Sequence, residues 1–100
     1  MSNESAVSTF QAVLRRELPA LAEHYHVASL GLFGSYLRGE QRADSDLDVL
    51  ATFDEVPSLF QLVSLENHLS DLLGVKVDLV LRDSLKPHIG QNILQQVVAV

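Results

Sequence analysis

The amino-acid sequence predicts an α/β (α+β) domain with a small mixed β-sheet flanked by helices. Helical and strand-like apolar patterns alternate along the chain, in the order helix, strand, turn, strand, helix, strand, helix. The length of 100 residues suits one hydrophobic core but not two. A hydrophobic content of 47% is typical of a folded chain. We therefore expect residues 1–100 to form a single domain.

The first half of the chain predicts a helix and two strands. Residues 6–25 carry apolar side chains at three- and four-residue spacing, which indicates a helix that Pro19 is expected to kink or divide. Residues 27–33 form a short apolar run ending at a Gly-Ser pair, which indicates a strand entering a turn. A polar loop follows. Residues 46–53 alternate in polarity and predict the second strand.

The second half predicts a helix, a third strand and a last helix. Residues 58–73 have a leucine stripe, and Gly74 is a good C-terminal stop for that helix. Residues 75–82 are strand-like, and residues 87–99 have apolar side chains at helical spacing. The helix between strands two and three resembles a crossover, which favours a parallel pair. The short link between strands one and two allows an antiparallel pair.

Three carboxylates lie in this strand-like apolar sequence. Asp46 and Asp48 are two residues apart, so a strand directs both toward one face. Asp78 lies within the run VKVDLVL and reaches the same place if strands two and three are neighbours. Mg²⁺ prefers oxygen ligands, and buried carboxylates are costly unless they are paired or bound to metal. The pattern favours a phosphate-handling metal site, with Asp78 as a ligand, as a base for an attacking hydroxyl, or both.

These carboxylates also have an ordinary explanation. Asp46 and Asp48 could be exposed side chains on a solvated sheet face, and Ser45 before them is typical of a turn. Lys76 is expected on the same face as Asp78, so an ion pair could account for that carboxylate.

A candidate phosphate-binding turn precedes the aspartates. Gly34 lets backbone N–H groups approach a phosphate closely, and the hydroxyl of Ser35 can donate to a phosphate oxygen. Arg38 lies one helical turn further and can point at the same phosphates, whereas Arg42 is more simply a surface charge. The alternative is that Gly-Ser is only a turn, which is the commonest meaning of this pair.

Composition narrows the class of protein. Thirteen acidic and seven basic residues give a net charge of −6, which argues against direct binding to nucleic acid. The absence of cysteine excludes disulfides and thiolate metal sites and fits a reducing cytoplasm. We find no secretory signal and no apolar run of the ~20 residues that span a bilayer. We expect a cytoplasmic protein with no membrane contact.

The combined motif resembles the DNA polymerase beta-like nucleotidyltransferase superfamily. A Gly-Ser pair, a spacer, Asp-x-Asp and a later single Asp make up its signature, and here these are Gly34, Ser35, Asp46, Asp48 and Asp78. More narrowly, LFGSYLRGEQRADSDLDVLATF and LENHLSDLLGVKVDLVL look like the minimal nucleotidyltransferase (MNT) family, whose MntA-type members are antitoxins of HEPN/MNT toxin–antitoxin modules. The chain departs from the commonest family pattern where Tyr36 and Leu37 replace Arg and Ala.

The resemblance implies a nucleotidyltransferase fold and a two-metal reaction. Asp46 and Asp48 would hold two Mg²⁺ ions, and Asp78 would complete one metal site and help to activate the acceptor hydroxyl. The Gly-Ser pair would seat the β and γ phosphates of ATP with help from Arg38. The implied product is AMP attached to a tyrosine of a HEPN ribonuclease toxin, which would form a hetero-oligomer with this chain.

Two other functions stay open. The chain could neutralise its partner by binding alone, without catalysis. It could also be a small-molecule nucleotidyltransferase of the aminoglycoside-modifying type, although those relatives usually carry a second domain that holds the acceptor.

Overall fold

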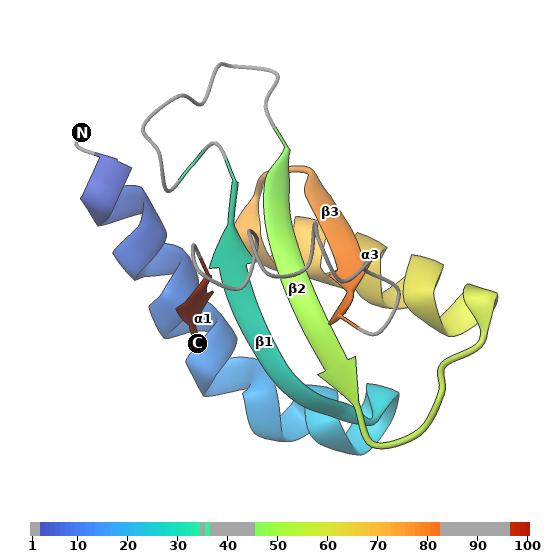
Figure 1. The fold of residues 1–100 in the computed structure, drawn as a ribbon. Coiled ribbons are helices and arrows are strands. Elements are labelled where there is room, and N and C mark those ends of the chain that lie inside the picture. The colour runs from blue at the N-terminus through green and yellow to red at the C-terminus, as the bar shows by residue number, and fades with distance from the viewer. Residues whose placement is uncertain (1–2, 35, 37–45, 83–96) are drawn as a thin grey trace.

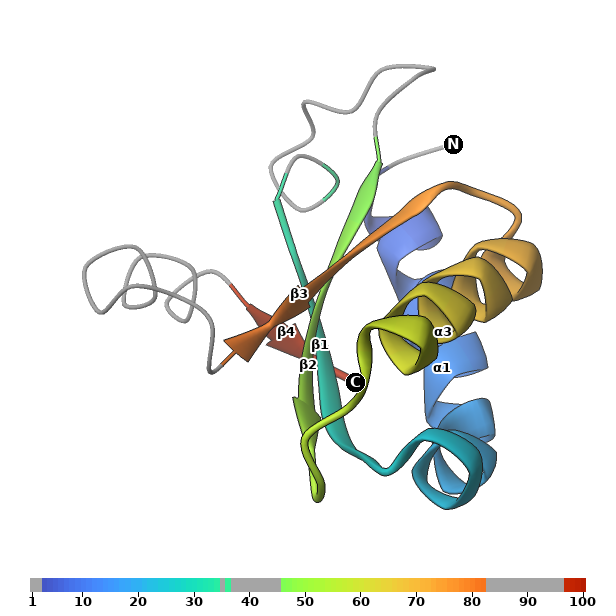
Figure 2. The same ribbon diagram turned by 90° about the vertical axis from the view of Figure 1, so that its right-hand side faces the viewer.

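The computed structural model describes residues 3–34, 36, 46–82 and 97–100. Its elements, in chain order, are α1 (Asn3–Tyr25), β1 (Val27–Phe33), β2 (Leu47–Phe53), α3 (Leu59–Leu73), β3 (Val77–Leu81) and β4 (Val98–Ala99). The four strands form one sheet, and α1 and α3 lie side by side on the same face of it (Figures 1 and 2). The predicted fold class is confirmed.

The sheet is mixed, with strand order β3-β2-β1-β4. β1 pairs antiparallel with β2, and β2 pairs parallel with β3. Both pairings follow from the connections: α3 carries the chain back along the sheet, so β3 starts at the same end as β2. The topology predicted for these three strands is therefore confirmed.

The last predicted helix is wrong where the structure describes it. Val98–Ala99 form β4, which pairs antiparallel with β1, whereas 83–96 lie outside the described residues. The N–H of Val100 donates to the carbonyl of Leu30 at 3.0 Å, and Gln11 Nε2 of α1 donates to the carbonyl of Ala99 at 3.0 Å. A free edge of β1 and β-branched valines favour a strand here over the helical spacing.

Helix α1 is longer than predicted and is not divided. It runs for 23 residues from Asn3 to Tyr25 and contains Pro19 within one helix. Proline removes one backbone donor, and the packing of the apolar side of α1 against the sheet outweighs that loss.

Helix α3 begins and ends close to its predicted limits because its caps are strong. The backbone N–H of Gln61 donates to Ser58 Oγ at 3.2 Å, and the N–H of Ser58 donates to Gln61 Oε1 at 3.0 Å, which is a reciprocal capping box. At the other end Gly74 has φ +72°, and its N–H donates to the carbonyl of Ser70 at 2.9 Å.

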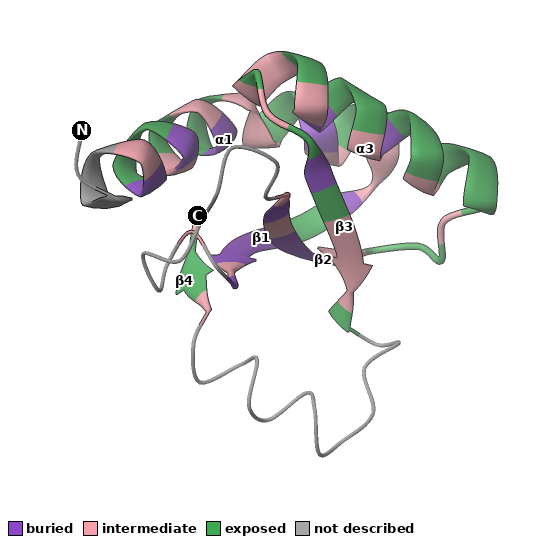
Figure 3. Ribbon diagram, turned by 90° about the horizontal axis from the view of Figure 1, so that it is seen from above, coloured by how far each residue is buried: buried purple, intermediate pink, exposed green. Residues whose placement is uncertain are grey.

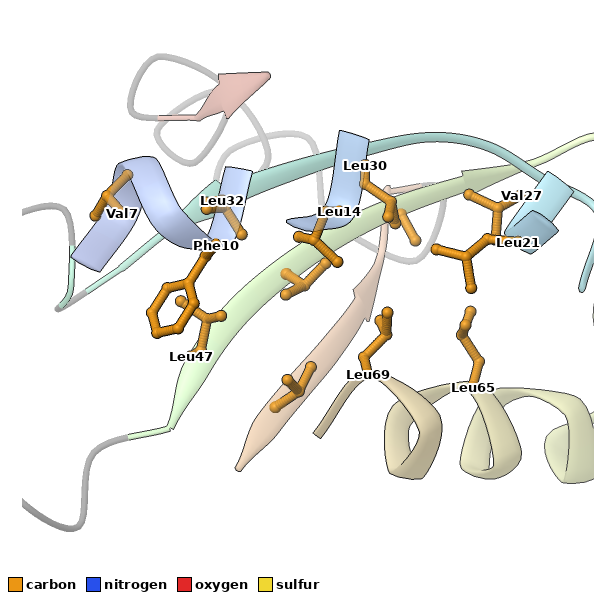
Figure 4. Packing of buried hydrophobic residues seen from close by; sticks show 13 residues of the cluster. Val7, Phe10, Leu14, Leu21, Val27, Leu30, Leu32, Leu47, Leu65 and Leu69 are labelled. Carbon is orange, nitrogen blue, oxygen red and sulfur yellow. The ribbon is translucent and has the colours of Figure 1, made fainter. Parts of the chain in front are cut away.

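The hydrophobic core lies between the two helices and the sheet (Figures 3 and 4). Leu14 and Leu21 of α1 meet Leu65 and Leu69 of α3 over the strands, and all four side chains are almost completely buried. Within the described residues, no helix has the length and apolar content needed to cross a membrane.

Candidate active site

The parallel register of β2 and β3 brings two of the predicted site residues together. Asp48 is the partner of Asp78 across these strands, about 4.8 Å away in backbone spacing. Their neighbours Leu47, Val49 and Val77 are buried in the core beneath the helices. Because side chains alternate along a strand, Asp48 and Asp78 point to the opposite face of the sheet. The prediction that strands two and three are neighbours at these aspartates is confirmed.

Asp46 lies one residue before β2, at the same end of the sheet. Its Oδ2 is 3.9 Å from Lys76 Nζ, and the N–H of Leu47 donates to the carbonyl of Lys76 at 2.8 Å. The lysine side chain is 79% exposed, so this ion pair adds little stability. Within the described part of the chain, Lys76 pairs with Asp46 and no ion pair joins it to Asp78. Lys76 therefore does not account for Asp78.

Gly34 lies directly against the carboxylate of Asp48. Its φ is +89°, a conformation that favours glycine, and Phe33 before it is the β1 partner of Asp48. A Cβ atom built at Gly34 would overlap the Oδ2 atom of Asp48. The end of β1 and the start of β2 thus meet at a point where only a glycine fits, whereas the predicted approach of the Gly34 backbone to a phosphate stays a prediction. Ser35 and Arg38, the other predicted phosphate-binding residues, lie outside the described residues.

Two side chains of α3 hold the strand that carries Asp78. Among the described strands β3 lies at one edge of the sheet, so alternate N–H groups have no partner in those strands. The N–H of Val77 donates to Ser70 Oγ at 2.9 Å, and the N–H of Leu79 donates to Glu66 Oε2 at 3.0 Å. The backbone is therefore fixed on both sides of Asp78.

Sequence reasoning missed Ser70 and Glu66. They are four residues apart on α3, and Ser70 Oγ also donates to the carbonyl of Glu66 at 2.9 Å. The available signal was a pair of polar residues at helical spacing beside buried Leu65 and Leu69. That spacing indicates that Glu66 and Ser70 lie on one face of the helix, but it does not show which strand they contact.

The donor chemistry of the aspartates fits a divalent cation. Asp48 and Asp78 supply carboxylate oxygens on adjacent strands, and Asp46 lies at the same end of β2. The geometry is incomplete, because among the described side chains no three His, Cys, Asp or Glu residues are close enough to hold a metal ion. Metal binding by all three aspartates stays a prediction.

Comparisons with known proteins identify a matching family model and similar sequences. Residues 14–100 match the model of the nucleotidyltransferase domain. The protein adenylyltransferase MntA of Thermococcus cleftensis is 44% identical over 90 residues, which cover 90% of this chain and 91% of that protein.

Solved structures agree with the fold. A minimal nucleotidyltransferase superposes with a TM-score of 0.75 at 34% identity, covering 100% of this chain and 97% of that one. A chain of a toxin–antitoxin complex with AMP-PNP has a TM-score of 0.66 at 26% identity, covering 97% and 71%. A chain of the Shewanella oneidensis complex of tri-AMPylated HEPN toxin with MNT antitoxin has a TM-score of 0.61 at 21% identity, covering 97% and 70%, a likeness of fold alone.

Proposed function

This chain belongs to the nucleotidyltransferase domain family and resembles its minimal members, and from that premise we propose that it transfers AMP from ATP to a tyrosine hydroxyl of a cognate HEPN ribonuclease toxin. Modification of the toxin neutralises it, so the chain acts as an antitoxin. The observation that carries the proposal is the register of Asp48 with Asp78 on the sheet face away from the helices. Two carboxylates on adjacent strands are suited to a cation-dependent phosphate reaction.

We assign Asp46, Asp48 and Asp78 as the ligands of two Mg²⁺ ions, and Gly34, Ser35 and Arg38 as the residues that seat the ATP phosphates. When bound, the metal ions offset the charge that develops on the phosphates. The three aspartates would hold the ions beside the phosphates, and Asp78 accepts the proton of the acceptor hydroxyl. A bond forms between the tyrosine oxygen and the α phosphorus, the bond from that phosphorus to the bridging oxygen breaks, and pyrophosphate leaves.

Two similarities support the choice of substrate and acceptor. The relative that is 44% identical is named a protein adenylyltransferase, and the similarity extends along most of both chains. One structural neighbour, 26% identical, is a toxin–antitoxin complex solved with AMP-PNP, an ATP analogue. These names describe the relatives, and they make AMP transfer to a protein the reaction to test first in this chain.

The test is incubation of the chain with labelled ATP, Mg²⁺ and the purified cognate HEPN protein. We expect label on a toxin tyrosine, and loss of the label in the Asp46→Ala, Asp48→Ala double variant. Asp71→Ala, an exposed carboxylate on α3, is the matched control and should transfer AMP normally. Folded components that transfer no label would contradict the proposal. A double variant that still protects cells fully at native expression would show that binding alone neutralises the toxin.

A further inference from the structure

Four exposed apolar side chains lie together where β2 leads into α3. Val56, Leu59, Phe60 and Val63 are 96%, 73%, 86% and 50% exposed, and we call them the α3 patch. Figure 3 shows the loop and the first turns of α3 as largely exposed. Contiguous apolar surface of this kind is uncommon on a protein that meets only water, and it is typical of an interaction site.

The α3 patch is not part of the hydrophobic core. The core side of α3 carries Leu65 and Leu69, which are fully buried, whereas Phe60 and Val63 point away from it. The capping box of Ser58 and Gln61 fixes the first turn of the helix. The helical part of the patch is therefore held in place before any partner binds, which lowers the entropy lost on binding.

Negative charge borders the α3 patch. Asp54 and Glu55 are exposed, and together with Val56 and Leu81 they line a hollow of about 220 Å³ beside the patch. The segment from Asp54 to Val63, which carries the patch, contains two acidic residues and no Lys or Arg. A partner surface that complements this region has apolar side chains bordered by Lys or Arg.

This charge pattern favours a different protein over a second copy of the chain. A two-fold interface through the α3 patch would bring Asp54 and Glu55 of each copy toward an equally acidic surface. We propose that the α3 patch docks the protein that this chain adenylylates, through an apolar surface of that protein bordered by Lys or Arg. The inference rests on the proposed function, because that function supplies the partner.

The docking surface and the candidate site are at opposite ends of β2. Asp48 lies at the start of the strand, and Phe53 at its end is about 17 Å further along at 3.3 Å per residue. Figure 1 shows the loop into α3 leaving the end of β2, at the opposite end of the strand from its start. The partner thus bridges this length of the sheet. Losing the docking contact raises the KM for the partner and leaves the kcat at saturating partner unchanged.

The experiment measures affinity for the purified cognate HEPN protein by calorimetry. The Phe60→Ser, Val63→Ser double variant should bind about tenfold more weakly, because buried apolar anchors dominate protein interfaces. Asn67→Ser is the matched control, an exposed position further along the same helix, and should bind within about twofold of the wild type. Asp54→Lys should slow association, whereas Asp71→Lys should change the association rate much less.

The readouts separate this inference from the proposed function. Unchanged affinity in the double variant overturns the docking surface even if AMP transfer proceeds. A wild-type dimer that the double variant converts to a monomer, with toxin affinity unchanged, assigns the α3 patch to a second copy and also overturns it. Weakened binding in the double variant together with no AMP transfer by the wild type supports the docking surface and contradicts the proposed reaction.

Discussion

At Gly34 the structure leaves no room for a side chain. The backbone has φ +89°, and a Cβ would overlap the carboxylate of Asp48. We expect Gly34→Ala to destabilise the fold by about 1 kcal/mol or more, because alanine is strained at this φ. We also expect a marked loss of AMP transfer, because Asp48 must move. Urea denaturation and the labelled-ATP assay measure the two effects.

Gly74 supplies the control for this substitution. It also has a positive φ, +72°, but an added Cβ there has no atom within 4 Å. Gly74→Ala should therefore lower stability by about 1 kcal/mol while leaving AMP transfer unchanged. Equal activity losses in the two alanine variants would contradict a specific contact between Gly34 and Asp48.

Asp78 provides a test of metal binding that does not depend on turnover. A ligand at about 100 times its dissociation constant stabilises a protein by roughly 2.7 kcal/mol. We expect Mg²⁺ to raise the melting temperature of the wild type, and Asp78→Asn to remove most of that increase. Without Mg²⁺, the variant should melt no lower than the wild type, because it relieves repulsion with the adjacent Asp48. An unchanged Mg²⁺ response in the variant would remove Asp78 from the metal site.

The sequence predicts where the aspartates lie along the chain's strands, but it does not predict which residues contact them. The two-residue period of a strand predicts the face of Asp48, whereas Asp46 lies one residue before β2. The contact of Gly34 with Asp48 and the ion pair of Lys76 with Asp46 depend on register and on rotamers. No local pattern in the chain encodes either of these.

At the scale of elements, the attachment of β3 to α3 leads to a prediction. Glu66→Ala removes the acceptor for the N–H of Leu79, and we expect a loss of about 1–3 kcal/mol for a partly buried donor left unpaired. Amide hydrogen exchange at Leu79 should accelerate, and AMP transfer should fall because Asp78 is less firmly held.

The Glu66→Gln variant tests whether the acceptor oxygen of Glu66 is what holds β3 and positions Asp78. Glu66→Gln keeps an acceptor oxygen and should restore both slow exchange and AMP transfer, whereas Asn67→Ala on the exposed side of α3 should affect neither. Fast exchange in Glu66→Ala with full AMP transfer would show that the attachment stabilises β3 without positioning Asp78.

The end of the chain shows why one element was predicted wrongly. The apolar residues near the end recur at helical spacing, but the segment Val97–Val100 is also rich in β-branched side chains. Tertiary context decides between these patterns: the backbone of β1 at Gly31 and Leu32 accepts a partner strand. Helix α3, in contrast, was predicted well because its capping residues are local in sequence.

At the scale of the whole molecule, Leu14 and Phe60 are large apolar side chains at opposite extremes of burial. Leu14 is completely buried in the core, whereas Phe60 is 86% exposed. We expect Leu14→Ala to lower the free energy of unfolding by about 2–5 kcal/mol. Phe60→Ser should change it by roughly 0.5 kcal/mol or less. Chemical denaturation of both variants checks the contrast, and a large loss in Phe60→Ser would place that side chain in the folded core.

Connection lengths made the arrangement of the first three strands predictable. A short link allows an antiparallel pair, and a crossover helix favours a parallel one, as β1-β2 and β2-β3 show. The sequence did not predict which face of the sheet the helices cover. The amphipathic patterns in α1 and α3 show only that each helix packs against a sheet. That shared face is what leaves Asp48 and Asp78 uncovered by either described helix.

The pairing of β4 with β1 has a consequence for how the molecule folds. β1, β2, α3 and β3 make contacts between neighbours in sequence, whereas β4 joins residues 98–99 to 31–32 across most of the chain. Closing so long a loop costs conformational entropy, and the pairing of two strand residues offsets only a small part of that cost. This strand is thus expected to dock last and to open first. The aspartates can therefore assemble before residues 98–99 have joined the sheet.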